Sequence, residues 1–203
     1  MTISVIQARQ MVKDLKDREI LLGRDPKTWY TYHNHVYGVA KVAKMIAHKT
    51  GTMDENRLYV MGLLHDICRT EENRFQRFHG ILGYEKLVKR DPEVARICLL
   101  HSFPWDKIAS YRVCADQFYH RKEDYQFIVD FIKKNQPKEE DYLIQLCDNL
   151  ANKNGFVTIE ERIDELIKRR GVCDIQNGVK RVNEIKRYFD QKIGCDIYGL
   201  LGK

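Results

Sequence analysis

Apolar residues recur along most of the chain at intervals of three and four positions, the spacing of a buried helix face. Capping residues, glycines and prolines divide this pattern into separate segments. We predict the first three helices over Ile3–Leu22, over Trp29–His48, and from Asp54 through the apolar run Leu58–Ile67. Alternating, strand-like segments are rare, so the sequence predicts an all-α protein.

Start and stop signals also define the later helices. An Asp followed by Pro, and a Thr three positions before a Glu, are typical of helix N-termini. These helices are predicted to run from Asp91 to about Ser102, from Pro137 through Asp148, from Thr158 to Gly171, and from Val179 to Gln191. The stretch Phe103–Gln136 mixes aromatic and basic residues without a clear period. Two interpretations stay open for it: a flap over a site, or another helical pair packed on the bundle.

Length and composition indicate one soluble, globular unit. The chain has 203 residues, of which 43% are hydrophobic and 32% charged, with no linker or internal repeat. We therefore expect a single domain over residues 1–203. No apolar run approaches a bilayer-spanning length, and the first residues do not read as a secretory signal. We expect a cytoplasmic protein, not bound to a membrane, with reduced and mostly buried thiols at Cys68, Cys98, Cys114, Cys147, Cys173 and Cys195.

The formal net charge of +6 favours anionic partners such as phosphates. No basic run is dense enough to indicate nucleic acid, so we expect none as a partner. The oligomeric state is left open.

Four histidines and two aspartates stand in core-like surroundings. His35 shares the apolar stripe of Val39 on its predicted helix, and His65 and Asp66 end an apolar run. The other three adjoin apolar residues too: His79, His101 and Asp148. A buried carboxylate is costly unless it is paired or bound to a cation.

Imidazoles and carboxylates together are the ligands that Zn, Fe, Mn or Ni accept in proteins. Six such side chains exceed the needs of one tetrahedral ion and suit two divalent ions that share a carboxylate. The sequence therefore predicts a binuclear metal site.

At these residues the sequence resembles the HD superfamily of metal-dependent phosphohydrolases. The blocks that carry the resemblance span residues 35–150: His35 with Val39-Ala40, Gly62-Leu63-Leu64-His65-Asp66-Ile67, Phe78-His79-Gly80, Leu99-Leu100-His101, and Leu146-Cys147-Asp148-Asn149-Leu150. The resemblance implies a single-domain helical bundle of the HD type. Its metal-binding core would cover about residues 28–152, with C-terminal helices over about 158–192 packed on it.

The resemblance also implies roles for the six residues. The first ion would be held by His35, His65, Asp66 and Asp148. Asp66 would bridge to a second ion completed by His79 and His101, and a hydroxide bridging the two ions would attack phosphorus. Asp66 is therefore assigned to the catalytic machinery.

Three basic residues are candidates for substrate contacts. Many members of the family have a lysine where this chain has Arg69, and an arginine can hold a phosphate oxygen in bidentate fashion. We assign Arg69 both a catalytic and a substrate-binding role, and we expect Arg77 and Lys153 to bind substrate.

The function predicted from the sequence is hydrolysis of a phosphoester or phosphoanhydride in a small, nucleotide-like substrate. Two alternatives remain. A mixed-valent di-iron oxygenase uses the same ligand order in this fold, and a non-catalytic regulator would bind metal or nucleotide without turnover.

Overall fold

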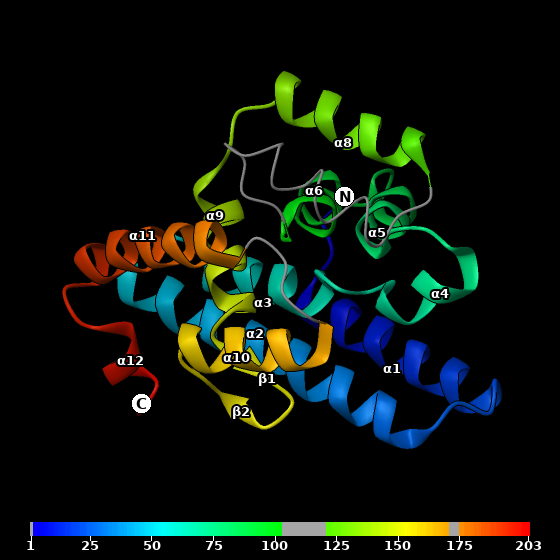
Figure 1. Cartoon of the computed structure of the whole chain (residues 1–203), viewed down its shortest axis with the longest axis horizontal. Coiled ribbons are helices and arrows are strands. Elements are labelled where there is room, and N and C mark those ends of the chain that lie inside the picture. Colours follow the sequence, from blue (N-terminus) through cyan, green and yellow to red (C-terminus); the bar gives the residue numbers. More distant parts are fainter. Residues whose placement is uncertain (1, 103–120, 171–174) are drawn as a thin grey trace.

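A computed structural model describes residues 2–102, 121–170 and 175–203 (Figure 1). These residues form helices and one short hairpin, which confirms the predicted all-α fold class. The long helices are α1 (Val5–Leu21), α2 (Pro26–Thr50), α3 (Glu55–Leu64), α5 (His79–Leu87), α6 (Pro92–Leu100), α8 (Lys122–Lys134), α9 (Glu139–Asp148), α10 (Ile159–Arg170) and α11 (Ile175–Ile193). The short elements are η1 (Arg69–Glu71), α4 (Glu72–Phe75), β1 (Ala151–Asn152), β2 (Gly155–Phe156) and α12 (Ile197–Leu200).

Most helix starts follow from local capping. Asp54 accepts hydrogen bonds from two backbone N–H groups at the start of α3, and Asp91 caps α6 ahead of Pro92. Thr158 and Glu161 exchange hydrogen bonds with each other's backbone N–H groups as a capping box before α10. α2 begins three residues earlier than predicted, because Asp25 caps it ahead of Pro26.

Helix α2 lies in the middle of the main hydrophobic core and packs most closely on α3. A Cβ atom at Gly62 would lie 2.8 Å from the Cα atom of Ala40. Only glycine permits this approach of the two backbones. The close contact brings the C-terminal end of α3 next to the buried face of α2, where two of the predicted ligand helices meet.

A second hydrophobic cluster joins α5, α6 and α8. Figure 1 shows α8 lying across α5 and α6, and the cluster contains the buried residues Phe78, Ile81, Leu99, Leu100, Ile128 and Ile132. Within the unassigned stretch Phe103–Gln136, residues 122–134 thus form a helix packed on the bundle. The flap interpretation concerns residues 103–120 as well, and these lie outside the described residues.

The chain after α9 turns back through the β1–β2 hairpin, in which Ala151 pairs with Phe156. This hairpin is an element that the sequence pattern did not predict. α10 and α11 follow, and α11 packs against α9, α2 and α10. The single-domain organisation of residues 1–203 stays a prediction.

Two further properties bear on the sequence-based expectations. Among the described residues, no helix combines the length and the apolar character that crossing a membrane requires. The thiols of Cys68, Cys98 and Cys147 are free and buried, whereas Cys195 is free and exposed. Cys114 and Cys173 lie outside the described residues.

Candidate metal centre

The six predicted ligands come from five helices. His35 lies within α2, and Asp148 is the last residue of α9. His65 follows the last turn of α3 and is directly followed by Asp66, while His79 is the first residue of α5. His101 caps the C-terminal end of α6. Helix ends therefore hold most of these side chains, where short segments can turn toward a common centre.

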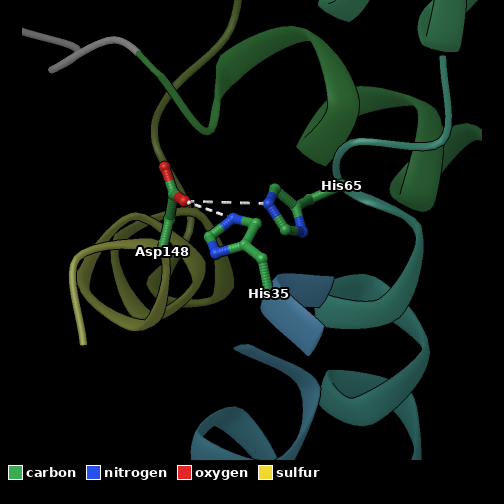
Figure 2. Close-up of side chains that lie close together, drawn as sticks. All are labelled: His35, His65 and Asp148. Atoms are coloured by element: carbon green, nitrogen blue, oxygen red, sulfur yellow. Dashed lines mark ion pairs between the residues drawn. The ribbon is translucent and has the colours of Figure 1, made fainter. Parts of the chain in front are cut away.

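One group of possible ligands gathers around Asp148 (Figure 2). Its Oδ1 atom lies 3.0 Å from Nε2 of His35 and 3.8 Å from Nε2 of His65. The ligand atoms of the three residues all lie within 4.8 Å of one another, close enough to contact one ion.

A second group gathers around Asp66. Its Oδ1 atom lies 2.9 Å from Nε2 of His79 and 3.3 Å from Nε2 of His101, and its Oδ2 atom lies 3.8 Å from Nε2 of His65. His65, Asp66 and His101 meet the same 4.8 Å criterion, so His65 belongs to both groups. The two groups are therefore adjacent.

Backbone carbonyls orient three of the four imidazoles. Nδ1 of His35 lies 3.0 Å from the Ala151 oxygen, Nδ1 of His65 lies 2.6 Å from the Gly62 oxygen, and Nδ1 of His101 lies 2.9 Å from the Cys98 oxygen. A carbonyl oxygen only accepts, so each Nδ1 carries the proton and donates it. Each Nε2 atom then carries a lone pair directed at the centre. This tautomer of the imidazole is the one whose Nε2 binds a metal ion.

Two buried atoms at the centre lack hydrogen bonds. Among the described residues, neither Nε2 of His65 nor Oδ1 of Asp66 makes a hydrogen bond of acceptable geometry, although both are fully buried. Buried polar atoms without a partner are costly, and a divalent cation would satisfy both. The donor set of imidazole nitrogens and carboxylate oxygens therefore fits a transition-metal site.

The protonation states of His65, Asp66 and Asp148 also suit metal binding. Burial lowers the pKa of His65 to about 4, which keeps its imidazole neutral. Burial would raise the pKa of Asp66 and Asp148, but the neighbouring imidazoles outweigh it and hold both pKa values well below the ordinary range. The pKa of His101 is raised, because its contact with Asp66 outweighs burial. Both carboxylates are thus ionised at neutral pH.

His79 differs from the other three predicted histidine ligands because side chains contact its Nδ1 atom. Nδ1 lies 3.2 Å from Oε1 of Glu72 and 2.8 Å from Nη1 of Arg69, and the same Nη1 lies 2.8 Å from Oε2 of Glu72. A guanidinium group only donates, so Nδ1 either donates to Glu72 or accepts from Arg69. Only donation to Glu72 leaves Nε2 free to bind a metal ion.

The predicted substrate contacts differ in their surroundings. Arg69 contacts the site through His79. Arg77 donates from Nε and Nη2 to Asp124 and from Nη1 and Nη2 to Glu85, so it connects α5 with α8. The side chain of Lys153 is exposed on the hairpin. No hydrogen bond or ion pair joins Arg77 or the Lys153 side chain to the six ligands within the described part of the chain.

Sequence reasoning missed two residues beside the centre, Glu72 and Arg162. Glu72 follows Glu71 directly, and no pattern distinguishes the carboxylate that faces His79 from the one that pairs with Arg18. Arg162 lies in the first turn of α10, where Nη2 reaches within 3.8 Å of Oδ1 of Asp148. Both contacts depend on how separate elements pack, which the sequence alone does not give.

A comparison with protein-family models matches the HD domain over residues 32–153. The match covers more than half of the chain and contains all six predicted ligands, so the chain belongs to the HD domain family of metal-dependent phosphohydrolases. Comparisons with curated proteins and with solved structures gave no match. Helices α10, α11 and α12 lie outside the matched range.

Proposed function

We propose that the protein hydrolyses a phosphoester or phosphoanhydride of a small, nucleotide-like substrate with the help of two divalent ions, Fe, Mn, Zn or Ni. The observation that carries this proposal is the pair of adjacent His/Asp groups that share His65, with three imidazoles fixed so that Nε2 faces the centre. Two bound cations lower the pKa of water and stabilise negative charge on the attacking and leaving oxygens.

The protein's own residues would hold the ions and orient the phosphate. His35, His65, Asp66 and Asp148 would bind the first ion, and Asp66, His79 and His101 the second. Asp66 and His65 lie between the two groups, and their contacts would fix the separation of the ions. Arg69 is 29% exposed and pairs with Glu72, so its guanidinium can exchange this partner for a phosphate oxygen.

The test is metal-dependent release of phosphate. Protein stripped of metal and reloaded with Mn²⁺ or Fe²⁺ is incubated with a broad panel of phosphorylated compounds, including nucleotides, and its metal content is measured by elemental analysis. We expect phosphate release only from the reloaded protein. No release from any compound would contradict the proposal, and substrate-dependent oxygen uptake by a di-iron form would favour the oxygenase alternative instead.

Variants of the bridging pair refine this test. His65→Ala and Asp66→Ala should lose metal and activity but keep most of the helical circular dichroism signal. His48→Ala is the matched control, because His48 is exposed and pairs with Glu55 outside the six ligands. Wild-type metal content in Asp66→Ala would contradict the bridging role of Asp66.

A further inference from the structure

Arg162 is a buried cation beside the metal centre that belongs to α10, outside the range matched by the HD domain model. The residue is 8% exposed. Its Nη2 atom lies 3.8 Å from Oδ1 of Asp148, the same oxygen that Nε2 of His35 approaches at 3.0 Å. The guanidinium of Arg162 and the imidazole of His35 thus approach the same carboxylate oxygen.

The hydrogen bonds of Arg162 leave one edge of its guanidinium unused. Nη1 donates to Oε2 of Glu165 at 3.0 Å. Nε is buried and makes no hydrogen bond to a described residue, and Nη2 is too far from Asp148 to donate to it. The Nε and Nη2 hydrogens point the same way and form the fork that binds two oxygens of a carboxylate or phosphate.

Two other arginines of this protein have the same edge filled. Arg96 donates from Nε and Nη2 to Asp141 at 3.0 and 2.7 Å. Arg77 donates from Nε and Nη2 to Asp124 at 3.0 and 2.8 Å. Arg18 and Arg57 also have a buried Nε without a hydrogen bond, although each forms an ion pair through another guanidinium nitrogen. An unfilled Nε alone therefore does not distinguish Arg162, and its distinguishing feature is that this edge lies beside Asp148.

The short connection between α9 and α10 places the start of α10 beside the candidate metal centre. Only ten residues separate the end of α9 from the start of α10, and they include the β1–β2 hairpin. The hairpin is tied down because Val157 N–H donates to the Leu150 oxygen, and the fully buried Ile159 fixes the first turn of α10. Arg162 also lies in that turn. Its position is therefore set by the short connection that leads from Asp148 to α10.

We propose that Arg162 is a substrate-binding residue, whose Nε–Nη2 edge takes two oxygens of the phosphate group bound beside Asp148. This inference rests on the proposed function and extends it, because it assigns the C-terminal part of the chain a role in substrate binding. Arg69 and Arg162 would then contact the substrate from the two groups of ligands, one beside His79 and one beside Asp148.

The test measures binding of inorganic phosphate to Mn²⁺-loaded protein by calorimetry, with Mn²⁺ affinity as a second readout. Arg162→Met should weaken phosphate binding by about 10-fold or more, since hydrogen bonds to a charged group are lost. Mn²⁺ affinity should stay equal or rise, because a cation beside the ligands has been removed. Loss of a residue that only supports the fold would instead lower both affinities together.

Three further variants make the result decisive. Lys168→Met removes the same charge from an exposed position on α10 and should change neither affinity. Arg162→Gln keeps a polar group in the buried position and should also weaken phosphate binding about 10-fold, so it replaces Arg162→Met if that variant does not fold. Arg162→Lys should restore part of the affinity, because it retains the charge but not the fork.

The outcomes separate this inference from the proposed function. Phosphate affinity within about twofold of wild type in Arg162→Gln, or no phosphate binding by the loaded wild-type protein, would overturn the role of Arg162. Turnover without an effect of Arg162 on KM would leave the hydrolase proposal intact and reject the inference. Phosphate binding that depends on Arg162, without turnover of any compound, would support the inference and reject the hydrolase proposal.

Discussion

At the scale of single residues, the orientation of each imidazole depends on its Nδ1 atom, the nitrogen that faces away from the centre of the site. Carbonyl oxygens of Ala151, Gly62 and Cys98 favour the tautomer of His35, His65 and His101 that carries its proton on Nδ1. The corresponding partner of His79 is a side chain, Glu72, which competes with Arg69. Substitution of a side chain that contacts His79 should therefore alter metal binding without removing a proposed ligand.

Glu72→Ala should lower the affinity for one of two bound ions by about 10- to 100-fold, the usual effect of removing an outer partner of a ligating histidine. Without Glu72, Arg69 donates to Nδ1 of His79 and stabilises the tautomer whose Nε2 carries a proton. Titration of metal-free protein with Mn²⁺, followed by calorimetry, measures both affinities.

The neighbouring carboxylate supplies the control for this prediction. Glu71 pairs with Arg18 and Lys86 rather than with His79, so Glu71→Ala should bind both ions as wild type does. Equal affinities in Glu72→Ala and wild type would show that Glu72 does not orient His79.

At the scale of elements, local signals predicted helices better than their connections. Asp54, Asp91-Pro92 and the Thr158–Glu161 capping box each mark an observed helix start. The β1–β2 hairpin was missed because strands of two residues show too little of an alternating pattern. Helix α5 was missed because no side chain caps its start, whereas α6, which has the same length of nine residues, is marked by Asp91-Pro92. The α5 start depends instead on packing: a Cβ at Gly80 would lie 2.6 Å from the Cys98 oxygen of α6.

Asp91 shows how one cap joins several elements. Its carboxylate accepts hydrogen bonds from the N–H of Ile3 before α1, from the N–H of Val94 in α6, and from the guanidinium of Arg57 in α3. Burial would raise the pKa of Asp91, but Arg57 and the two N–H donors outweigh it and lower the pKa below its ordinary value of 3.8. This interaction therefore stabilises the fold above pH 3.8 and is lost as the pH falls below it.

Asp91→Asn should reduce the free energy of unfolding at pH 7 by about 2–4 kcal/mol, because Arg57 loses its ionised partner. The difference from wild type should shrink as the pH falls below the ordinary pKa of 3.8, where the wild-type carboxyl takes up a proton too. Urea unfolding at pH 7 and at acid pH measures both effects.

Asp54→Asn is the matched control for this prediction. Asp54 caps α3 from an exposed position, and asparagine caps a helix about as well as aspartate does. Its unfolding free energy should stay near that of wild type. A loss as large in Asp54→Asn as in Asp91→Asn would contradict the role assigned to the buried ion pair.

At the scale of the whole molecule, the site joins elements that are distant in the sequence. The sequence already indicated which six side chains would lie in core-like surroundings, because each histidine or aspartate follows or interrupts an apolar run, and the structure brings them together. Their role as metal ligands stays a prediction. Their grouping was not predictable from the sequence, since His65 belongs to both groups through the packing of α3 between α2, α6 and α9. Arg162 reaches Asp148 only because the hairpin folds α10 back, a relation that no local pattern encodes.

Metal binding should therefore stabilise the whole bundle, since an ion at either group would add a connection between side chains of separate helices. With Mn²⁺ at about 100 times its dissociation constant, stability should rise by about 2.7 kcal/mol, equivalent to about 5–10 °C in Tm for a chain of this size. Ca²⁺ should have little effect, because it prefers oxygen ligands and the site offers mainly imidazole nitrogens. Thermal unfolding followed by circular dichroism, with EDTA, Mn²⁺ or Ca²⁺, measures the three values. The same Tm in EDTA and in Mn²⁺ would show that these side chains do not bind ions jointly, and His48→Ala, which leaves all six ligands in place, should keep the full Mn²⁺ shift.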